Sequence, residues 1–158
     1  MKEKTDNTKF IPKKDYRVCV KYLPVPTTDV VIFNPDQTKV LLFKRINKPL
    51  KGEFFTLGGR IIKGEDLKDS AIRKIEEEIG IKISSDQLIF GGIIDEKIEK
   101  SMFEDMDQHN INIFWGLTLP ENTKIKLDSQ HSEYKWFDIN DPFHKLVRKK
   151  IDMIISEL

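Results

Sequence analysis

The chain has 158 residues, 27 basic and 26 acidic, with a formal net charge of +1, which suits one domain and gives no overall reason to expect nucleic-acid binding. Its one cysteine, Cys19, excludes an intrachain disulfide and a cysteine-based zinc site. Residues 1–14 lack the apolar stretch of a secretory signal and no apolar run could span a bilayer, so we expect a cytoplasmic protein without membrane partners.

The beginning of the chain predicts a short tail and then one domain. Residues 1–10 are polar and are expected to form a flexible tail, with a single domain over residues 11–158. The segment 11–26 leaves two alternatives open. The run Val18-Cys19-Val20 favours a strand, whereas Asp15 could cap a short helix with an apolar face.

Two strands are expected next, at residues 29–33 and 39–45. The intervening Asn34-Pro35-Asp36-Gln37 has the composition of a turn, so the pair predicts a hairpin. A short apolar piece at residues 54–57 follows, and we expect Gly58 and Gly59 to break it.

The clearest helix runs from Glu65 or Asp66 to Ile79, and Gly80 supplies the expected stop. Its apolar positions recur at helical spacing, so one face should be buried. The positions in this stripe are Leu67, Ala71, Ile72, Ile75 and Ile79.

The second half predicts three strands, near residues 87–95, 111–119 and 133–137, and a charged loop or lid at 96–109. Residues 142–158 predict an amphipathic helix, whose inward side chains would be Phe143, Leu146, Val147, Ile151, Ile154 and Ile155. The order of elements indicates an α/β fold with a mixed sheet between helices.

One carboxylate, Glu78, falls inside the apolar stripe of the first clear helix. A buried carboxylate is costly unless its charge is compensated, and a hard divalent cation would do this. The preceding glycines allow a sharp turn that could aim a carbonyl at the same ion. The alternative is ordinary helix stabilisation, because Arg73–Glu77 and Lys74–Glu78 are pairs at four-residue spacing.

The joint spacing of this segment resembles the Nudix box, which is Gly, five residues, Glu, seven residues, then Arg-Glu-aliphatic-x-Glu-Glu-x-Gly-aliphatic. The matching positions are Gly59, Glu65, Arg73, Ile75, Glu77, Glu78, Gly80 and Ile81. Lys74 departs from the pattern, which has Glu at this position. The resemblance implies the Nudix fold, with a loop-helix-loop motif, and the departure makes a multi-metal site less favourable.

Outside the box, several fragments resemble the GDP-mannose mannosyl hydrolase branch of this family. They are Pro26-Thr-Thr-Asp29, Leu42-Phe-Lys-Arg45-Ile-Asn-Lys-Pro49, Gly52 with Phe55, Gly58-Gly59-Arg60, and Gln130-His131-Ser-Glu-Tyr134-Lys-Trp136. The resemblance implies hydrolysis of GDP-mannose to GDP and mannose by attack of water at the anomeric carbon. It also implies a homodimer in which the N-terminal segment meets the partner.

The resemblance implies a role for each matching side chain. The carbonyl of Gly59, the carboxylate of Glu78 and the side chain of Gln130 would hold one Mg²⁺, with Mn²⁺ as the alternative ion. Glu77 would join them. Arg45 and Arg60 would contact the diphosphate, Asp29 would contact the sugar, and His131 would be the general base.

Simpler interpretations of these residues remain open. Arg45 could be a surface cation at a strand end, Arg60 a loop cation and Asp29 a turn-capping residue. Gln130 and His131 lie in a polar loop, where a solvated histidine is the commoner case.

Two other functions also stay open. One is conventional pyrophosphohydrolysis of a nucleotide sugar or nucleoside triphosphate, and the other is a non-catalytic domain that senses a nucleotide.

Overall fold

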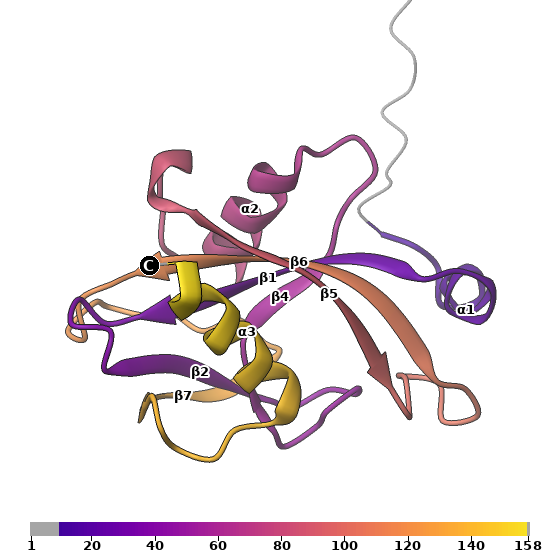
Figure 1. The fold of residues 1–158 in the computed structure, drawn as a ribbon. Coiled ribbons are helices and arrows are strands. Elements are labelled where there is room, and N and C mark those ends of the chain that lie inside the picture. Colours follow the sequence, from indigo (N-terminus) through magenta and orange to yellow (C-terminus); the bar gives the residue numbers. More distant parts are fainter. Residues whose placement is uncertain (1–9, 158) are drawn as a thin grey trace, which may run out of the picture.

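Within residues 10–157, which the structure describes, seven strands form one mixed sheet with helices around it in a computed structural model (Figure 1). This confirms the predicted fold class. The expected tail lies outside the described residues, apart from Phe10. The elements are α1 (Lys13–Tyr22), β1 (Val25–Phe33), β2 (Lys39–Arg45), β3 (Phe54–Phe55), β4 (Leu57–Arg60), α2 (Leu67–Ile79), a 3₁₀ turn (Ser85–Gln87), β5 (Ile89–Ile98), β6 (Gln108–Thr118), β7 (His131–Asp138) and α3 (Lys145–Glu157).

Strand β1 is the centre of the sheet, whose order is β3-β2-β1-β6-β5, with β4 added to β1 and β7 to β2. The predicted hairpin is confirmed, because Ile32 and Phe33 pair antiparallel with β2. The first half of β1 pairs with β4 instead, and its whole length runs parallel to β6. Asp29 therefore faces Gly58 in the register on one side and Phe114 on the other.

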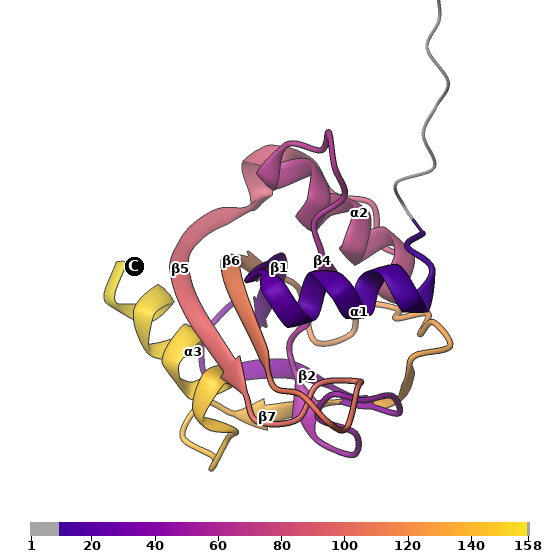
Figure 2. The ribbon, with the colours of Figure 1, turned by 90° about the vertical axis from the view of Figure 1, so that its right-hand side faces the viewer.

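Successive side chains of β1 point to opposite faces of the sheet, so alternate residues pack into two separate hydrophobic cores. Val30 and Ile32 pack with the apolar face of α2, whereas Val31 and Phe33 pack with α3. The two helices lie on opposite faces of the sheet, and α1 crosses one end of it (Figures 1 and 2). No helix within residues 10–157 combines the length and apolar character needed to cross a membrane.

The helices largely follow their predicted patterns. Of the two alternatives for residues 11–26, the segment forms the helix, α1, and β1 begins shortly after it at Val25. Helix α2 ends at Gly80, whose φ of 71° is the left-handed conformation that glycine adopts readily. Leu67 and Ile155 were expected to point inward but are 47% and 42% exposed, because each lies at a helix end beyond the packed stripe.

Several strand boundaries differ from the predictions. Gly58 and Gly59 do not break the apolar piece at residues 54–57, because β4 continues through both glycines as partners of β1. Strands β5 and β6 extend into the segment expected to be a loop, and only 99–107 connects them. These extensions rest on pairing between the two strands, which local sequence does not reveal.

Candidate active site

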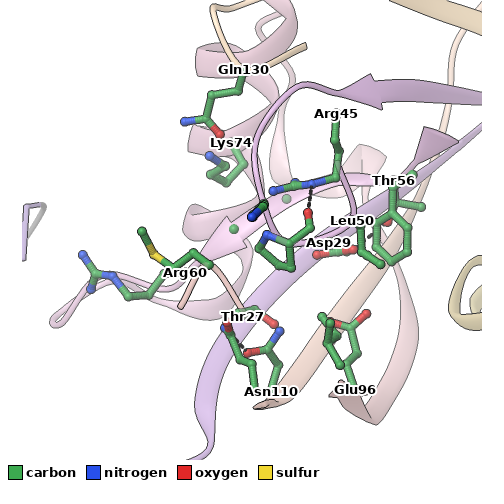
Figure 3. Close-up of a pocket in the computed structure, with 18 of the residues that line it drawn as sticks. Thr27, Asp29, Arg45, Leu50, Thr56, Arg60, Lys74, Glu96, Asn110 and Gln130 are labelled. Atoms are coloured by element: carbon green, nitrogen blue, oxygen red, sulfur yellow. Dashed lines mark hydrogen bonds between the residues drawn. The ribbon is translucent and has the colours of Figure 1, made fainter. Parts of the chain in front are cut away.

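A cavity of about 290 Å³ opens where β1 and β4 meet the loop after β2 (Figure 3). Its lining separates into two kinds of charge, with carboxylates from Asp29 and Glu96 and cations from four other side chains. The cations are Arg45, Lys48, Arg60 and Lys74. The predicted residues Asp29, Arg45, Gly59, Arg60 and Gln130 all line this cavity, so the structure brings them together.

Glu78 lies beneath the cavity and is only 1% exposed, which confirms its inward position. Its Oε1 accepts a hydrogen bond from Lys74 Nζ at 2.7 Å, and its Oε2 accepts one from the Gly58 N–H at 3.1 Å. Burial raises the pKa of Glu78, and the neighbouring Lys74 ammonium opposes this rise. Glu78 is therefore buried, and the pairing at four-residue spacing that the alternative interpretation expects is present.

The oxygen donors around Glu78 have the chemistry that a divalent ion prefers. A carboxylate, the backbone at Gly59 and the Gln130 amide are hard ligands suited to Mg²⁺. The Lys74 ammonium already contacts this carboxylate, and it lies 3.2 Å from where a Cβ on Gly59 would stand. The chemistry of these donors suits one divalent ion, but the described residues hold no group of three or more His, Cys, Asp or Glu side chains that could bind a metal. An ion at Glu78 would compete with the Lys74 ammonium for the carboxylate.

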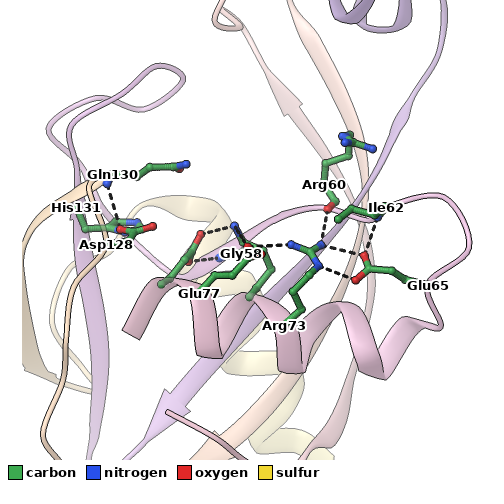
Figure 4. Close-up of polar contacts among 11 residues, drawn as sticks. Gly58, Arg60, Ile62, Glu65, Arg73, Glu77, Asp128, Gln130 and His131 are labelled. Atoms are coloured by element: carbon green, nitrogen blue, oxygen red, sulfur yellow. Dashed lines mark hydrogen bonds and ion pairs between the residues drawn. The ribbon is translucent and has the colours of Figure 1, made fainter. Parts of the chain in front are cut away.

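Arg73 connects the loop before α2 to the helix itself (Figure 4). It donates to Glu65 Oε2 at 2.6 Å and to Glu77 Oε2 at 3.0 Å. Glu65 also accepts the Ile62 N–H at 2.8 Å. Burial opposes ionisation of Glu65, but these bonds outweigh it and leave its pKa lowered. Glu65 therefore orders the loop, while Glu77 contacts Arg73 and also lies 4.0 Å from the cavity-lining Lys74.

The carboxylate of Asp29 is 6% exposed and belongs to a buried network that was not predicted. Lys150 Nζ, from α3, donates to Asp29 Oδ2 at 2.6 Å and to Glu96 Oε2 at 2.7 Å. Thr56 and Asn112 also donate to Asp29. Burial raises the pKa of Glu96 against the effect of Lys150. For Lys150, burial acts to lower the pKa, but the two carboxylates outweigh it and leave the pKa raised.

A glycine at position 58 lets β4 approach this network closely. A Cβ built there would lie 2.2 Å from Asp29 Oδ1 and 2.2 Å from the Thr28 carbonyl oxygen. Contacts this short cannot be accommodated without moving the backbone of β1 or β4. Gly58 therefore serves two purposes, since its N–H also holds Glu78.

The predicted arginines reach the cavity from different elements. Arg45 ends β2, and its Nε donates to the Pro49 carbonyl at 2.8 Å, which fixes the side chain against the loop. Arg60 ends β4, and its Nη1 donates to the Ile61 carbonyl at 3.4 Å. Two planar guanidinium groups on one cavity suit paired bonds to phosphate oxygens.

His131 is buried at the start of β7, beside the cavity-lining Gln130. Its Nδ1 lies 2.8 Å from Asp128 Oδ1 (Figure 4). Its ring meets the Phe43 ring edge-on, with centroids 5.7 Å apart. Among described residues, the cavity lining includes Gln130 but not His131. The backbone N–H of Asp128 donates to the Glu78 carbonyl at 3.0 Å, so the end of α2 positions this loop.

The sequence analysis did not identify Lys150 or Glu96, although the periodicity of α3 and β5 indicates that both side chains are buried. Lys150 falls within the apolar stripe of α3, between Val147 and Ile151, where a lysine must find a buried partner. Glu96 lies two residues after Ile94, on the same inward face of β5. Each position was recognisable as a buried charge, but nothing local indicates that the two charges meet.

Comparison with known proteins indicates the same family as the Nudix box of residues 59–81. The NUDIX domain model matches residues 23–156. The low-salt glycan biosynthesis protein Agl8 of Haloferax volcanii is 29% identical over 93% of this chain and 92% of its own length. The ADP-ribose pyrophosphatase of Methanocaldococcus jannaschii is 31% identical over 84% of this chain and 73% of its own length.

Solved structures agree with the fold. The MutT protein of Methanosarcina mazei superposes with a TM-score of 0.68 at 19% identity, covering 85% of this chain and 95% of that one. The NUDIX domain of Shewanella oneidensis NrtR, complexed with ADP ribose, gives 0.68 at 18% identity, covering 93% and 99%. The box, the fold and the family match together place this chain in the Nudix hydrolase family.

Proposed function

We propose that this chain hydrolyses a nucleoside diphosphate sugar, with GDP-mannose as the preferred candidate, to the nucleoside diphosphate and the free sugar. The observation that carries the proposal is the lining of the cavity, which combines arginine and lysine side chains with the buried carboxylates of Asp29 and Glu96. Cations suit a diphosphate, and carboxylates suit the hydroxyl groups and the developing positive charge of a sugar.

Each residue then has a distinct task. Arg45 and Arg60 bind the diphosphate and stabilise its charge as it leaves. Asp29, held by Lys150, would face the anomeric carbon. His131 accepts the proton of the attacking water, and Asp128 orients the imidazole through Nδ1.

The proposed metal site comprises Glu78, Gly59 and Gln130, with Glu77 as a further carboxylate nearby. A bound Mg²⁺, or Mn²⁺ in its place, supplies positive charge to the leaving diphosphate. The relative named for glycan biosynthesis supports a sugar-containing substrate.

A conventional pyrophosphohydrolase is the second candidate. The pyrophosphatase relative and the presence of Glu77 favour it. It predicts that Glu77→Gln is severe and His131→Ala mild, whereas attack at carbon predicts that His131→Ala is severe. A third candidate, a nucleotide sensor, predicts binding without turnover.

Isotope placement separates these candidates. The protein is incubated with GDP-mannose and Mg²⁺ in ¹⁸O-labelled water, and mass spectrometry measures the ¹⁸O content of each product. Label in free mannose with unlabelled GDP supports attack at carbon. GMP with mannose 1-phosphate shows cleavage between the phosphates, and no turnover across a nucleotide panel favours the sensor.

We also propose a homodimer that uses the outward face of α1, where Val18 and Tyr22 are 56% and 68% exposed. Contiguous exposed apolar side chains mark interaction surfaces. Light scattering should give twice the chain mass, and Val18→Glu with Tyr22→Glu should give the monomer. A monomeric unmodified protein at high micromolar concentration would contradict this proposal.

A further inference from the structure

A second cavity, of about 360 Å³, lies between α1 and the loop after β4. Tyr16 and Arg60 line both this cavity and the first, so the two are neighbours. Helix α1 crosses the end of the sheet at this place (Figure 2). Most of the remaining lining is apolar and comprises Ile11, Cys19, Leu23, Pro24, Val25, Pro26, Ile61 and Ile62.

Tyr16 is fixed between the two cavities. Gln108, on the wall of the first cavity, donates from Nε2 to the Tyr16 hydroxyl at 3.4 Å. The Tyr16 ring packs against Phe103 with centroids 6.1 Å apart. An aromatic ring and the Arg60 guanidinium thus stand at the boundary, and both groups offer flat faces on which a planar ring can stack.

We propose that the second cavity binds the heterocyclic base of the nucleoside diphosphate, while its diphosphate lies in the first cavity. This inference rests on the proposed function and extends it by assigning the base a place. Each cavity is near the lower end of the range of about 300–1,000 Å³ for small-molecule sites. The apolar lining suits the faces of a base, and Lys63 brings a polar group for its edge.

Cys19 makes the inference directly testable, because it is the one cysteine of the chain and lines the second cavity but not the first. The rate at which iodoacetamide alkylates Cys19 is measured by mass spectrometry without ligand, with GDP and with inorganic pyrophosphate. At GDP tenfold above its Kd we expect the rate to fall about elevenfold, since only free protein reacts. Saturating pyrophosphate should leave the rate unchanged, because it has no base.

A matched variant moves the thiol to an exposed position outside both cavities. In Cys19→Ser with Lys82→Cys, at a position whose side chain is 86% exposed, the new thiol should react at the same rate with and without GDP. Calorimetry on both proteins gives the Kd values, and we expect GDP to bind at least about tenfold more tightly than pyrophosphate through stacking of its base.

The remaining outcomes overturn the inference in distinguishable ways. GDP that binds without protecting Cys19 places the base elsewhere and leaves the proposed function intact. Equal protection by pyrophosphate means that the base is not what covers the thiol. Protection that grows with protein concentration alone identifies a second copy of the chain as the occupant. If GDP does not bind, the proposed function fails and the inference fails with it.

Discussion

Lys74 is the residue that most changes what this box can do. Its ammonium bonds to Glu78 at 2.7 Å, lies 4.0 Å from Glu77 and is only partly accessible. At the proposed metal site, a divalent ion and this ammonium would both require the Glu78 carboxylate. The lysine would then set the affinity of that site for an ion as well as its charge.

Replacing Lys74 with methionine should strengthen ion binding. The variant keeps a long aliphatic side chain but removes the competing bond, and a bond to a charged group contributes enough for about a tenfold change. Mn²⁺ binding followed by electron paramagnetic resonance measures the effect. Lys82→Met is the control, since Lys82 is exposed and pairs with Glu76. Unchanged or weaker Mn²⁺ binding by K74M would show that the two cations do not compete.

At the scale of the element, helix α3 supplies more than a cover for the sheet. Lys150 is fully buried and reaches both Asp29 and Glu96, so α3 fixes the carboxylates of the cavity on β1 and β5. Removing one partner from a buried ion network leaves the other charges uncompensated.

We expect Lys150→Met to lower the free energy of unfolding by about 3–5 kcal/mol, as measured in urea. Lys149→Met, at the exposed neighbouring position, should have little effect. Adding Glu96→Gln to Lys150→Met should recover part of the loss, because one buried negative charge is then removed. Equal stabilities of the single and double variants would contradict the network.

The loop before α2 should give the protein an acid-sensitive component of stability. The pKa of Glu65 is lowered from 4.5, so its contribution is fully present above pH 4.5 and is lost as the pH falls through the lowered folded value. In urea unfolding, Glu65→Gln should therefore be less stable than the unmodified protein at pH 7. The difference should shrink below pH 4.5. Glu76→Gln, on the exposed face of α2, should show no such trend, and a constant difference for Glu65→Gln would refute the linkage.

Across the whole molecule, the loop 99–107 joins distant parts around the cavity. Asp105 pairs with Arg17 of α1, and Glu104 pairs with Lys48 of the loop after β2. The Arg17 hydrogen bond lowers the pKa of Asp105 to about 2. These pairs are exposed, so they restrain the loop without contributing much to global stability.

Asp105→Asn should therefore leave the urea midpoint unchanged while amide hydrogen exchange in residues 99–107 becomes faster. Asp107→Asn, at an exposed position of the same loop, serves as the control and should alter neither measurement. Unchanged exchange in the Asp105 variant would show that the Arg17 pair does not restrain the loop.

The features that could be predicted from the sequence are those set by interactions between residues close together in the chain. Helix α2, its stop at Gly80 and the burial of Glu78 were predictable because helical periodicity and capping are local. The joining of Lys150 to Asp29 spans 121 positions, and no local pattern specifies which buried charges meet. The continuation of β4 through Gly58 likewise depends on its pairing with β1.

The bond between Lys74 and Glu78 also bears on how the protein can be handled. Because the buried carboxylate has a counter-charge within its own helix, stripping divalent ions with a chelator should not leave it uncompensated. Preparation in EDTA should therefore preserve the folded state, and adding ions back should restore whatever turnover depends on them.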